Sequence, residues 1–193
     1  MRGMGICLVA GTSLLALGAV YASTVIGLIV EDQARLSRYV VVGEIVAQKG
    51  VDDPRSGLET EVTLRVVSSL KGDARPGQAI AFHTRSGELN GEISTADGEA
   101  VLHTGQRVLV FVEEIEGRLY NLGLSYGVFQ VQENGKGRQS VVRDLQDGLA
   151  IVGEEEVGNG PFTIEDIQTR VSYAKQHPRF DSAVVRDTFG EGR

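Results

Sequence analysis

The sequence predicts an all-β protein, a small antiparallel barrel preceded by an N-terminal apolar leader and followed by a C-terminal helix. Short apolar runs rich in β-branched residues alternate with turn-forming breaks, and the chain of 193 residues has 25 glycines against 4 prolines. No run of about 10 to 15 helical residues separates the central strands, which argues against parallel strand-helix-strand units. The single cysteine, Cys7, lies in the leader, so the remaining chain has no disulfide and must fold by packing.

Residues 1–22 have the pattern of a secretory signal peptide. Arg2 precedes the apolar stretch Ile6–Val20, and the small residue Ala22 offers a cleavage point that would start the mature chain at Ser23. This predicts an extracytoplasmic location: secreted, periplasmic or on the cell surface. The alternative is an uncleaved signal anchor extending to about residue 30, which would attach the same domain to the membrane, because apolar residues resume from Val25 to Val30.

Residues 23–37 are predicted to form an N-terminal arm or short helix that packs on the barrel. Its expected apolar stripe is Ile26, Ile29, Val30 and Leu36, and its expected solvent-facing residues are Glu31, Asp32 and Arg35.

Residues 38–146 are predicted to form the barrel domain. The run YVVVGEIVAQ at Tyr39–Gln48 is its first strand, Glu59–Leu70 alternates apolar and polar residues as a half-buried strand does, and Gln78–Thr84 follows as a third. Arg107–Glu113 has apolar residues on both faces, which predicts a central strand. The residues expected in the core are Val42, Val62, Leu64, Val66, Phe82, Val110 and Phe111.

Shorter strands are predicted at Arg118–Leu122, Gly127–Gln132 and Ser140–Asp144, with an Asn134-Gly135 hairpin loop joining the last two. Residues 147–162 are predicted as a linker and residues 163–177 as the C-terminal helix, which Thr163 and Asp166 open as a capping box. Residues 178–193 are predicted as a tail.

The long segment between Arg85 and Thr104 is the candidate partner-binding loop. It is predicted to be mostly irregular, and irregular loops beyond about 12 to 15 residues are usually functional or disordered. Its polar residues Arg85, Glu88, Asn90 and Glu92 are the candidate partner contacts, with simple flexibility of the segment as the alternative.

Four stretches together resemble a known family: Tyr39–Val46, Val62–Val66, Leu70-Lys71-Gly72 and Gly105–Phe111. They are similar to exported bacterial proteins of unknown role whose domain resembles the netrin and tissue-inhibitor-of-metalloproteinase module. The similarity covers about residues 36–145 and implies an OB-like barrel, with inhibition or assistance of a secreted metalloprotease as one implied function. The animal inhibitors chelate the protease zinc through an N-terminal cysteine, whereas no cysteine follows residue 22 here.

The sequence offers no group of residues typical of catalysis. The predicted mature chain has neither cysteine nor a G-x-S-x-G elbow, and His83, His103 and His177 lack the spacing of a zinc-binding helix. We therefore predict no catalytic, cofactor-binding or metal-binding residues and assign the histidines structural roles.

The balance of the remaining features favours binding. A formal net charge of -7 without a basic cluster disfavours nucleic acid as a partner. Tyr120, Tyr126 and Phe129 offer a glycan-stacking platform as one alternative, although their dispersed spacing favours burial. The sequence thus predicts an exported, non-enzymatic binding module of the bacterial envelope or exterior with a protein partner. The alternatives are a metalloprotease inhibitor or accessory domain, and a binder of glycan or envelope polymer.

Overall fold

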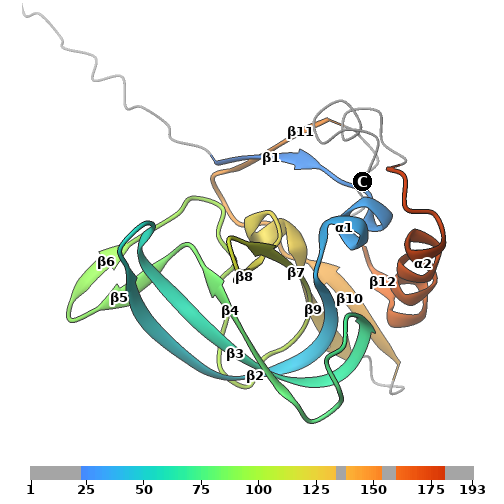
Figure 1. Cartoon of the computed structure of the whole chain (residues 1–193), viewed down its shortest axis with the longest axis horizontal. Coiled ribbons are helices and arrows are strands. Elements are labelled where there is room, and N and C mark those ends of the chain that lie inside the picture. Colours follow the sequence, from blue (N-terminus) through green and yellow to red (C-terminus); the bar gives the residue numbers. More distant parts are fainter. Residues whose placement is uncertain (1–22, 134–137, 154–159, 181–193) are drawn as a thin grey trace, which may run out of the picture.

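The computed structural model describes residues 23–133, 138–153 and 160–180 (Figure 1). The predicted leader, the Asn134-Gly135 loop and most of the predicted tail lie outside these residues. The strands are β1 Ser23–Gly27, β2 Tyr39–Asp53, β3 Gly57–Lys71, β4 Ala79–Thr84, β5 Gly87–Leu89, β6 Glu92–Ser94, β7 Arg107–Ile115, β8 Arg118–Asn121, β9 Val128–Glu133, β10 Gln139–Arg143, β11 Leu149–Gly153 and β12 Phe162–Thr163. The helices are α1 Val30–Leu36 and α2 Ile164–Gln176, with a 3-10 turn at Leu124–Gly127.

Five strands close into a ring, seen end-on in Figure 1. The sheet runs β12-β10-β9-β7-β2-β3-β4-β8, and β8 also pairs with β7, so that β7, β2, β3, β4 and β8 form a closed circuit. All neighbours in the ring are antiparallel except β4 and β8, whose parallel bridge joins His83 to Tyr120. The prediction of a mostly antiparallel β protein with a C-terminal helix is confirmed.

Two apolar cores lie on opposite faces of β2 and β7. Inside the ring, Val41 of β2 and Val110 of β7 pack with side chains of β3 and β4, including Leu64 and Phe82. On the outer face, alternate residues of β2 and β7 pack under the helices, as Phe111 does. This arrangement explains why both strands are apolar on both faces and confirms the prediction that β7 is central. All seven predicted core residues are buried, with at most 2% of each exposed.

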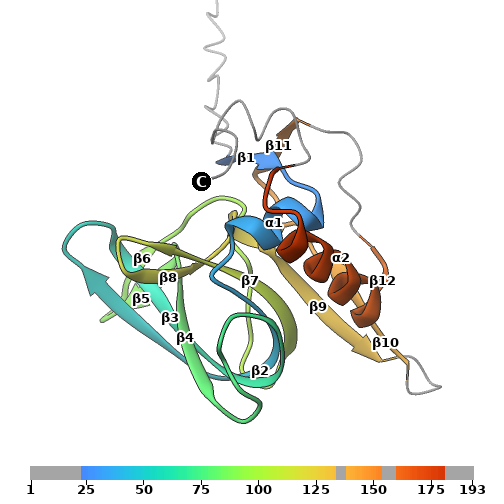
Figure 2. The ribbon, with the colours of Figure 1, turned by 45° about the vertical axis from the view of Figure 1, so that its right-hand side comes forward.

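The two helices pack beside each other over the outer core, with α2 running along the β9-β10 hairpin (Figure 2). The predicted capping box is confirmed: the Thr163 hydroxyl accepts a hydrogen bond from the Asp166 amide at 3.0 Å, and Asp166 accepts one from the Thr163 amide at 2.9 Å. Lys71 at the end of β3 fixes α1, because its ammonium donates to the carbonyls of Ala34 and Ser37 at 2.6 Å each.

The structure corrects three expectations about the flanking segments. Asp32 and Arg35, both expected to face water, pair at 2.5 Å with buried side chains, because α1 turns this side toward the protein. Residues 149–153, expected in a linker, form β11, which pairs in parallel with β1 in the N-terminal arm. Phe180, placed in the tail, is buried against the outer core. Among the described residues, neither helix has the length and apolar character needed to cross a bilayer.

Candidate functional site

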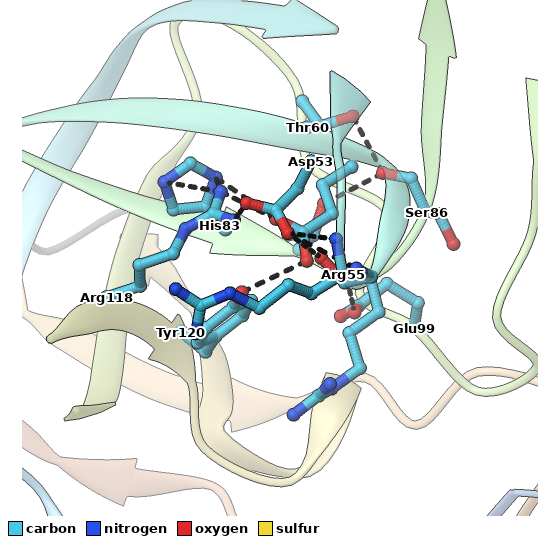
Figure 3. Close-up of polar contacts among 12 residues, drawn as sticks. Asp53, Arg55, Thr60, His83, Ser86, Glu99, Arg118 and Tyr120 are labelled. Atoms are coloured by element: carbon cyan, nitrogen blue, oxygen red, sulfur yellow. Dashed lines mark hydrogen bonds and ion pairs between the residues drawn. The ribbon is translucent and has the colours of Figure 1, made fainter. Parts of the chain in front are cut away.

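A cluster of charged side chains lies at the end of the ring where the β2-β3 and β7-β8 turns meet (Figure 3). Asp53 is the last residue of β2, Arg55 lies in the β2-β3 turn, and β8 contributes Arg118 and Tyr120. Because β3, β4 and β8 are neighbours in the ring, residues far apart in the sequence converge here.

Glu59 of β3 is the centre of the cluster, with only 1% of the residue exposed. One carboxylate oxygen accepts a hydrogen bond from Arg118 Nη2 at 2.8 Å, and the other accepts one from the Tyr120 hydroxyl at 3.0 Å. A buried carboxylate needs such partners, since leaving it unpaired would cost several kcal/mol. Both oxygens of Glu59 are thus engaged within the protein and hold β8 against β3.

Asp53 organises the β2-β3 turn and binds Arg118 from the other side. Its Oδ1 accepts hydrogen bonds from the backbone amides of Arg55 and Ser56 at 2.9 and 3.2 Å, while its Oδ2 pairs with Arg118 Nη1. The pKa of Asp53 is lowered, chiefly by the hydrogen bond from the Arg55 amide. Arg118 is therefore held between two carboxylates and has a fixed orientation.

The surroundings of His83 of β4 favour its neutral form. Burial lowers its pKa below the ordinary 6.5, and the Arg118 charge lowers it further, outweighing the opposing effect of Glu59. Arg118 Nη2 lies 3.1 Å from His83 Nδ1. Nε2 lies 3.4 Å from the same Arg118 nitrogen, and in a neutral ring the nitrogen without a proton accepts from Arg118. The 3.5 Å approach of His83 Nδ1 to Glu59 is consequently not a full ion pair.

Arg85, immediately after β4, is positioned differently from the other arginines. Its guanidinium carbon lies 5.0 Å from the centre of the Tyr120 ring, within cation-π range. In the part of the chain that the structure describes, no hydrogen bond or ion pair joins this guanidinium to a carboxylate, although its backbone amide donates to Glu99 at 2.7 Å. Arg85 is exposed. Burial raises the pKa of the Glu113 carboxyl of β7, and the charge of Arg85 opposes this rise with a smaller lowering effect.

A cavity of about 270 Å³ lies beside the cluster. It is lined by Asp53, Arg55, Ser56, Arg85, Ile115, Glu116, Arg118 and Tyr120. We call it the arginine pocket. It is smaller than the roughly 300 to 1,000 Å³ usual for small-molecule sites and suits a single side chain or a small anion. Arg55 binds Glu116 at 2.6 Å in a pair more than 70% exposed on both sides; such pairs contribute little and exchange readily. Arg55 and Arg85 can thus bind an incoming carboxylate while Arg118 keeps the pocket in shape.

The four predicted partner contacts are all exposed, and the structure separates them. Arg85 lines the arginine pocket, whereas Glu88, Asn90 and Glu92 belong to a hairpin formed by β5 and β6. The segment is mostly irregular, as predicted, apart from the two three-residue strands of this hairpin. Asn90 and Gly91 both have positive φ, 54° and 84°, as a two-residue hairpin turn requires. The Asn-Gly pair was the signal in the sequence that predicts this hairpin.

The proposed stacking platform does not form, because its three aromatic residues are buried. Tyr120, Tyr126 and Phe129 are 6%, 1% and 0% exposed. Packing on the core, the favoured interpretation of these residues, is confirmed. The Tyr126 hydroxyl instead donates to the Leu28 carbonyl at 2.7 Å and fixes the N-terminal arm.

Sequence reasoning missed Glu59, Asp53 and Arg118 as members of one site. Each occurs in an ordinary charged turn or strand, and nothing local marks it. Comparison with models of known protein families finds no match, and comparison with curated proteins finds none.

Proposed function

We propose that this chain is an exported, non-enzymatic binding module whose protein partner inserts a carboxylate side chain into the arginine pocket. The observation that carries the proposal is Arg85: an exposed guanidinium resting on a buried tyrosine ring, beside a rigid Arg118 and an exchangeable Arg55. Guanidinium groups bind carboxylates in bidentate geometry, which gives direction as well as affinity.

The order of the strands in the ring supports an OB-like architecture, and the pocket lies at the turns that such barrels use for binding. The ring strands β2, β3, β4, β7 and β8 are the first to fifth along the chain. Around the ring their order is first, second, third, fifth, fourth and back to the first. A five-stranded ring in this order is consistent with the OB-type barrel that the family resemblance implies. OB-type barrels bind ligands through the turns between strands one and two and between strands four and five. These correspond here to the β2-β3 and β7-β8 turns, which carry Arg55 and Glu116.

The acid and base groups of the cluster already have hydrogen-bond partners within the protein, which favours binding over catalysis. Glu59, His83 and Tyr120 donate to or accept from one another or Arg118, so the acid and base groups stabilise the site. The hydroxyl of Ser56, in the β2-β3 turn, donates to Asp53 at 3.1 Å. Groups engaged in this way make a preorganised surface.

The test is retention of a native partner by the full chain and by Arg85→Gln. Each protein is immobilised and exposed to an envelope or culture-supernatant fraction, and retained proteins are quantified by mass spectrometry. We expect Arg85→Gln to lose the partner, and the loss to resemble the effect of raised salt on the unmodified protein, since salt screens exposed charges. Arg75→Gln is the matched control, because Arg75 is an exposed arginine in the turn before β4, outside the pocket. Equal retention by both variants would refute the proposal.

The metalloprotease alternative is tested separately. The full chain is incubated with secreted zinc proteases and a fluorogenic substrate, and slowed turnover is the expected result if that alternative holds. Arg85→Gln then shows whether the arginine pocket takes part in inhibition.

A further inference from the structure

A second cavity, of about 480 Å³, is lined in part by Thr84 and Ser86, which flank Arg85 of the arginine pocket in the sequence. Its lining includes Ile93 and Ser94 of β6, residues 95–102 that follow, and Thr60 and Thr84 of β3 and β4. We call it the hairpin groove. None of the described residues that line it lies in a helix.

The hairpin groove exposes apolar side chains. Five large hydrophobic residues are exposed among the described residues, and two of them line this groove: Ile93 with 70% of its surface exposed and Val101 with 55%. Apolar side chains gathered at a cavity are typical of surfaces that bind a partner.

The free edge of β6 presents backbone groups in the same place. Asn90 and Gly91 form the two-residue turn, so Leu89 and Glu92 are the hydrogen-bonded pair beside it, and Glu88 and Ile93 are the next, non-hydrogen-bonded pair. The amide and carbonyl of Ile93 therefore point away from β5. β6 pairs with no second strand within the described ranges, so these two groups are available to an extended peptide.

The hairpin is held firmly against the ring. A Cβ added to Gly87 would lie 2.4 Å from the Glu59 carbonyl oxygen, and one added to Gly50 would lie 1.8 Å from that of Glu88. Neither glycine has positive φ, so each is required by close approach of backbones. The edge of β6 is thus preorganised, which lowers the entropy cost of binding.

The charge of the groove indicates which peptide it suits. Asp97, Glu99 and Asp147 line it, without a lysine or arginine. Both oxygens of Glu99 accept internal hydrogen bonds, from the amides of Arg85 and Ala100. Asp97 and Asp147 are exposed, and these two carboxylates set an electrostatic preference opposite to that of the arginine pocket.

We infer that the hairpin groove binds an extended peptide segment of a partner protein, with apolar side chains on Ile93 and Val101 and a basic side chain facing Asp97 and Asp147. The peptide pairs with β6 through the amide and carbonyl of Ile93. Main-chain pairing supplies affinity in this mode, and alternate side chains supply specificity.

The test is a fluorescence-anisotropy titration of the full chain with two labelled synthetic peptides, one of alternating valine and lysine and one of alternating valine and glutamate. We expect the lysine peptide to bind more tightly. Ile93→Ala removes the apolar contact and should weaken binding by roughly fivefold. Ile93→Pro also removes the outward amide and should weaken binding by about a further fivefold. A free strand edge tolerates proline, because the amide that it lacks has no partner in the sheet.

The control is Val152→Ala, which removes another exposed apolar side chain, on β11, and should bind normally. Asp97→Asn combined with Asp147→Asn should reduce the advantage of the lysine peptide over the glutamate peptide. Thermal melting by circular dichroism verifies that each variant folds, and Ile93→Ala keeps the test decisive if Ile93→Pro does not. Absence of binding by either peptide, tighter binding of the glutamate peptide, or unchanged binding by Ile93→Ala would overturn the inference.

Discussion

Removing the negative charge of Glu59 should destabilise the whole ring. Glu59→Gln preserves the shape of the side chain but removes its charge and one of its two acceptors, so either Arg118 Nη2 at 2.8 Å or the Tyr120 hydroxyl at 3.0 Å loses its carboxylate oxygen. Leaving a buried donor unsatisfied costs about 1 to 3 kcal/mol. Arg118 keeps Asp53 as a partner and its side chain is 29% exposed, which reduces the penalty. We expect a loss of about 2 kcal/mol, or a melting temperature lower by roughly 4 to 8 °C.

The reciprocal variant tests whether the two groups act as a pair. Arg118→Met leaves the Glu59 carboxylate buried with Tyr120 as its hydrogen-bond donor, and should cost about 2 to 3 kcal/mol. The double variant should cost less than the sum of the two single losses by about 1 to 2 kcal/mol, because the second change removes a group already left unpaired.

Urea unfolding followed by circular dichroism measures these losses, since the chain has no tryptophan for fluorescence. Glu44→Gln is the control: Glu44 pairs with Arg65 at 2.8 Å with side chains 37% and 54% exposed, and its loss should cost below about 1 kcal/mol. Strict additivity of Glu59→Gln and Arg118→Met, or equal losses for Glu44→Gln and Glu59→Gln, would refute the assignment of Glu59 as the centre of the cluster.

Three further predictions concern the core, pH and export. Leu64→Ala, at 0% exposure in the ring interior, should cost about 2 to 5 kcal/mol, whereas Thr63→Ala on the opposite face should cost little; equal losses in urea unfolding would contradict the alternation of β3. Because the pKa of His83 in the folded protein lies below its ordinary 6.5, protonation favours unfolding, so its contribution to stability is complete above about pH 6.5 and falls as the solution becomes more acidic. Melting temperatures compared between about pH 7.5 and 5.5 should fall less for His83→Gln than for the unmodified chain; parallel curves would contradict a buried neutral histidine. N-terminal sequencing of exported protein should find a start at Ser23, and a start at Met1 in the cytoplasmic fraction would exclude cleavage and export.

The sequence by itself determined where the main strands lie and which residues they bury. Val62, Leu64 and Val66 alternate because one face of β3 meets the core, and this period is readable in a single strand. The capping box of α2 was equally predictable, since Thr163 and Asp166 interact across one helical turn. Such signals are local, so they can be recognised without knowing which other segments pack against them.

Only the tertiary structure decided the candidate site. The alternation of β3 places Glu59 on the same face as Glu61 and Arg65, the face expected to meet solvent, yet Glu59 is 1% exposed. The reason is ring closure: β8 pairs with β4 through a single bridge at His83 and Tyr120, and this brings Arg118 over that end of β3. Pairing between segments so distant in the sequence leaves no periodic signal in either one, so the burial of Glu59 and the convergence of the arginines follow from how the strands close, which the strand pattern alone does not specify.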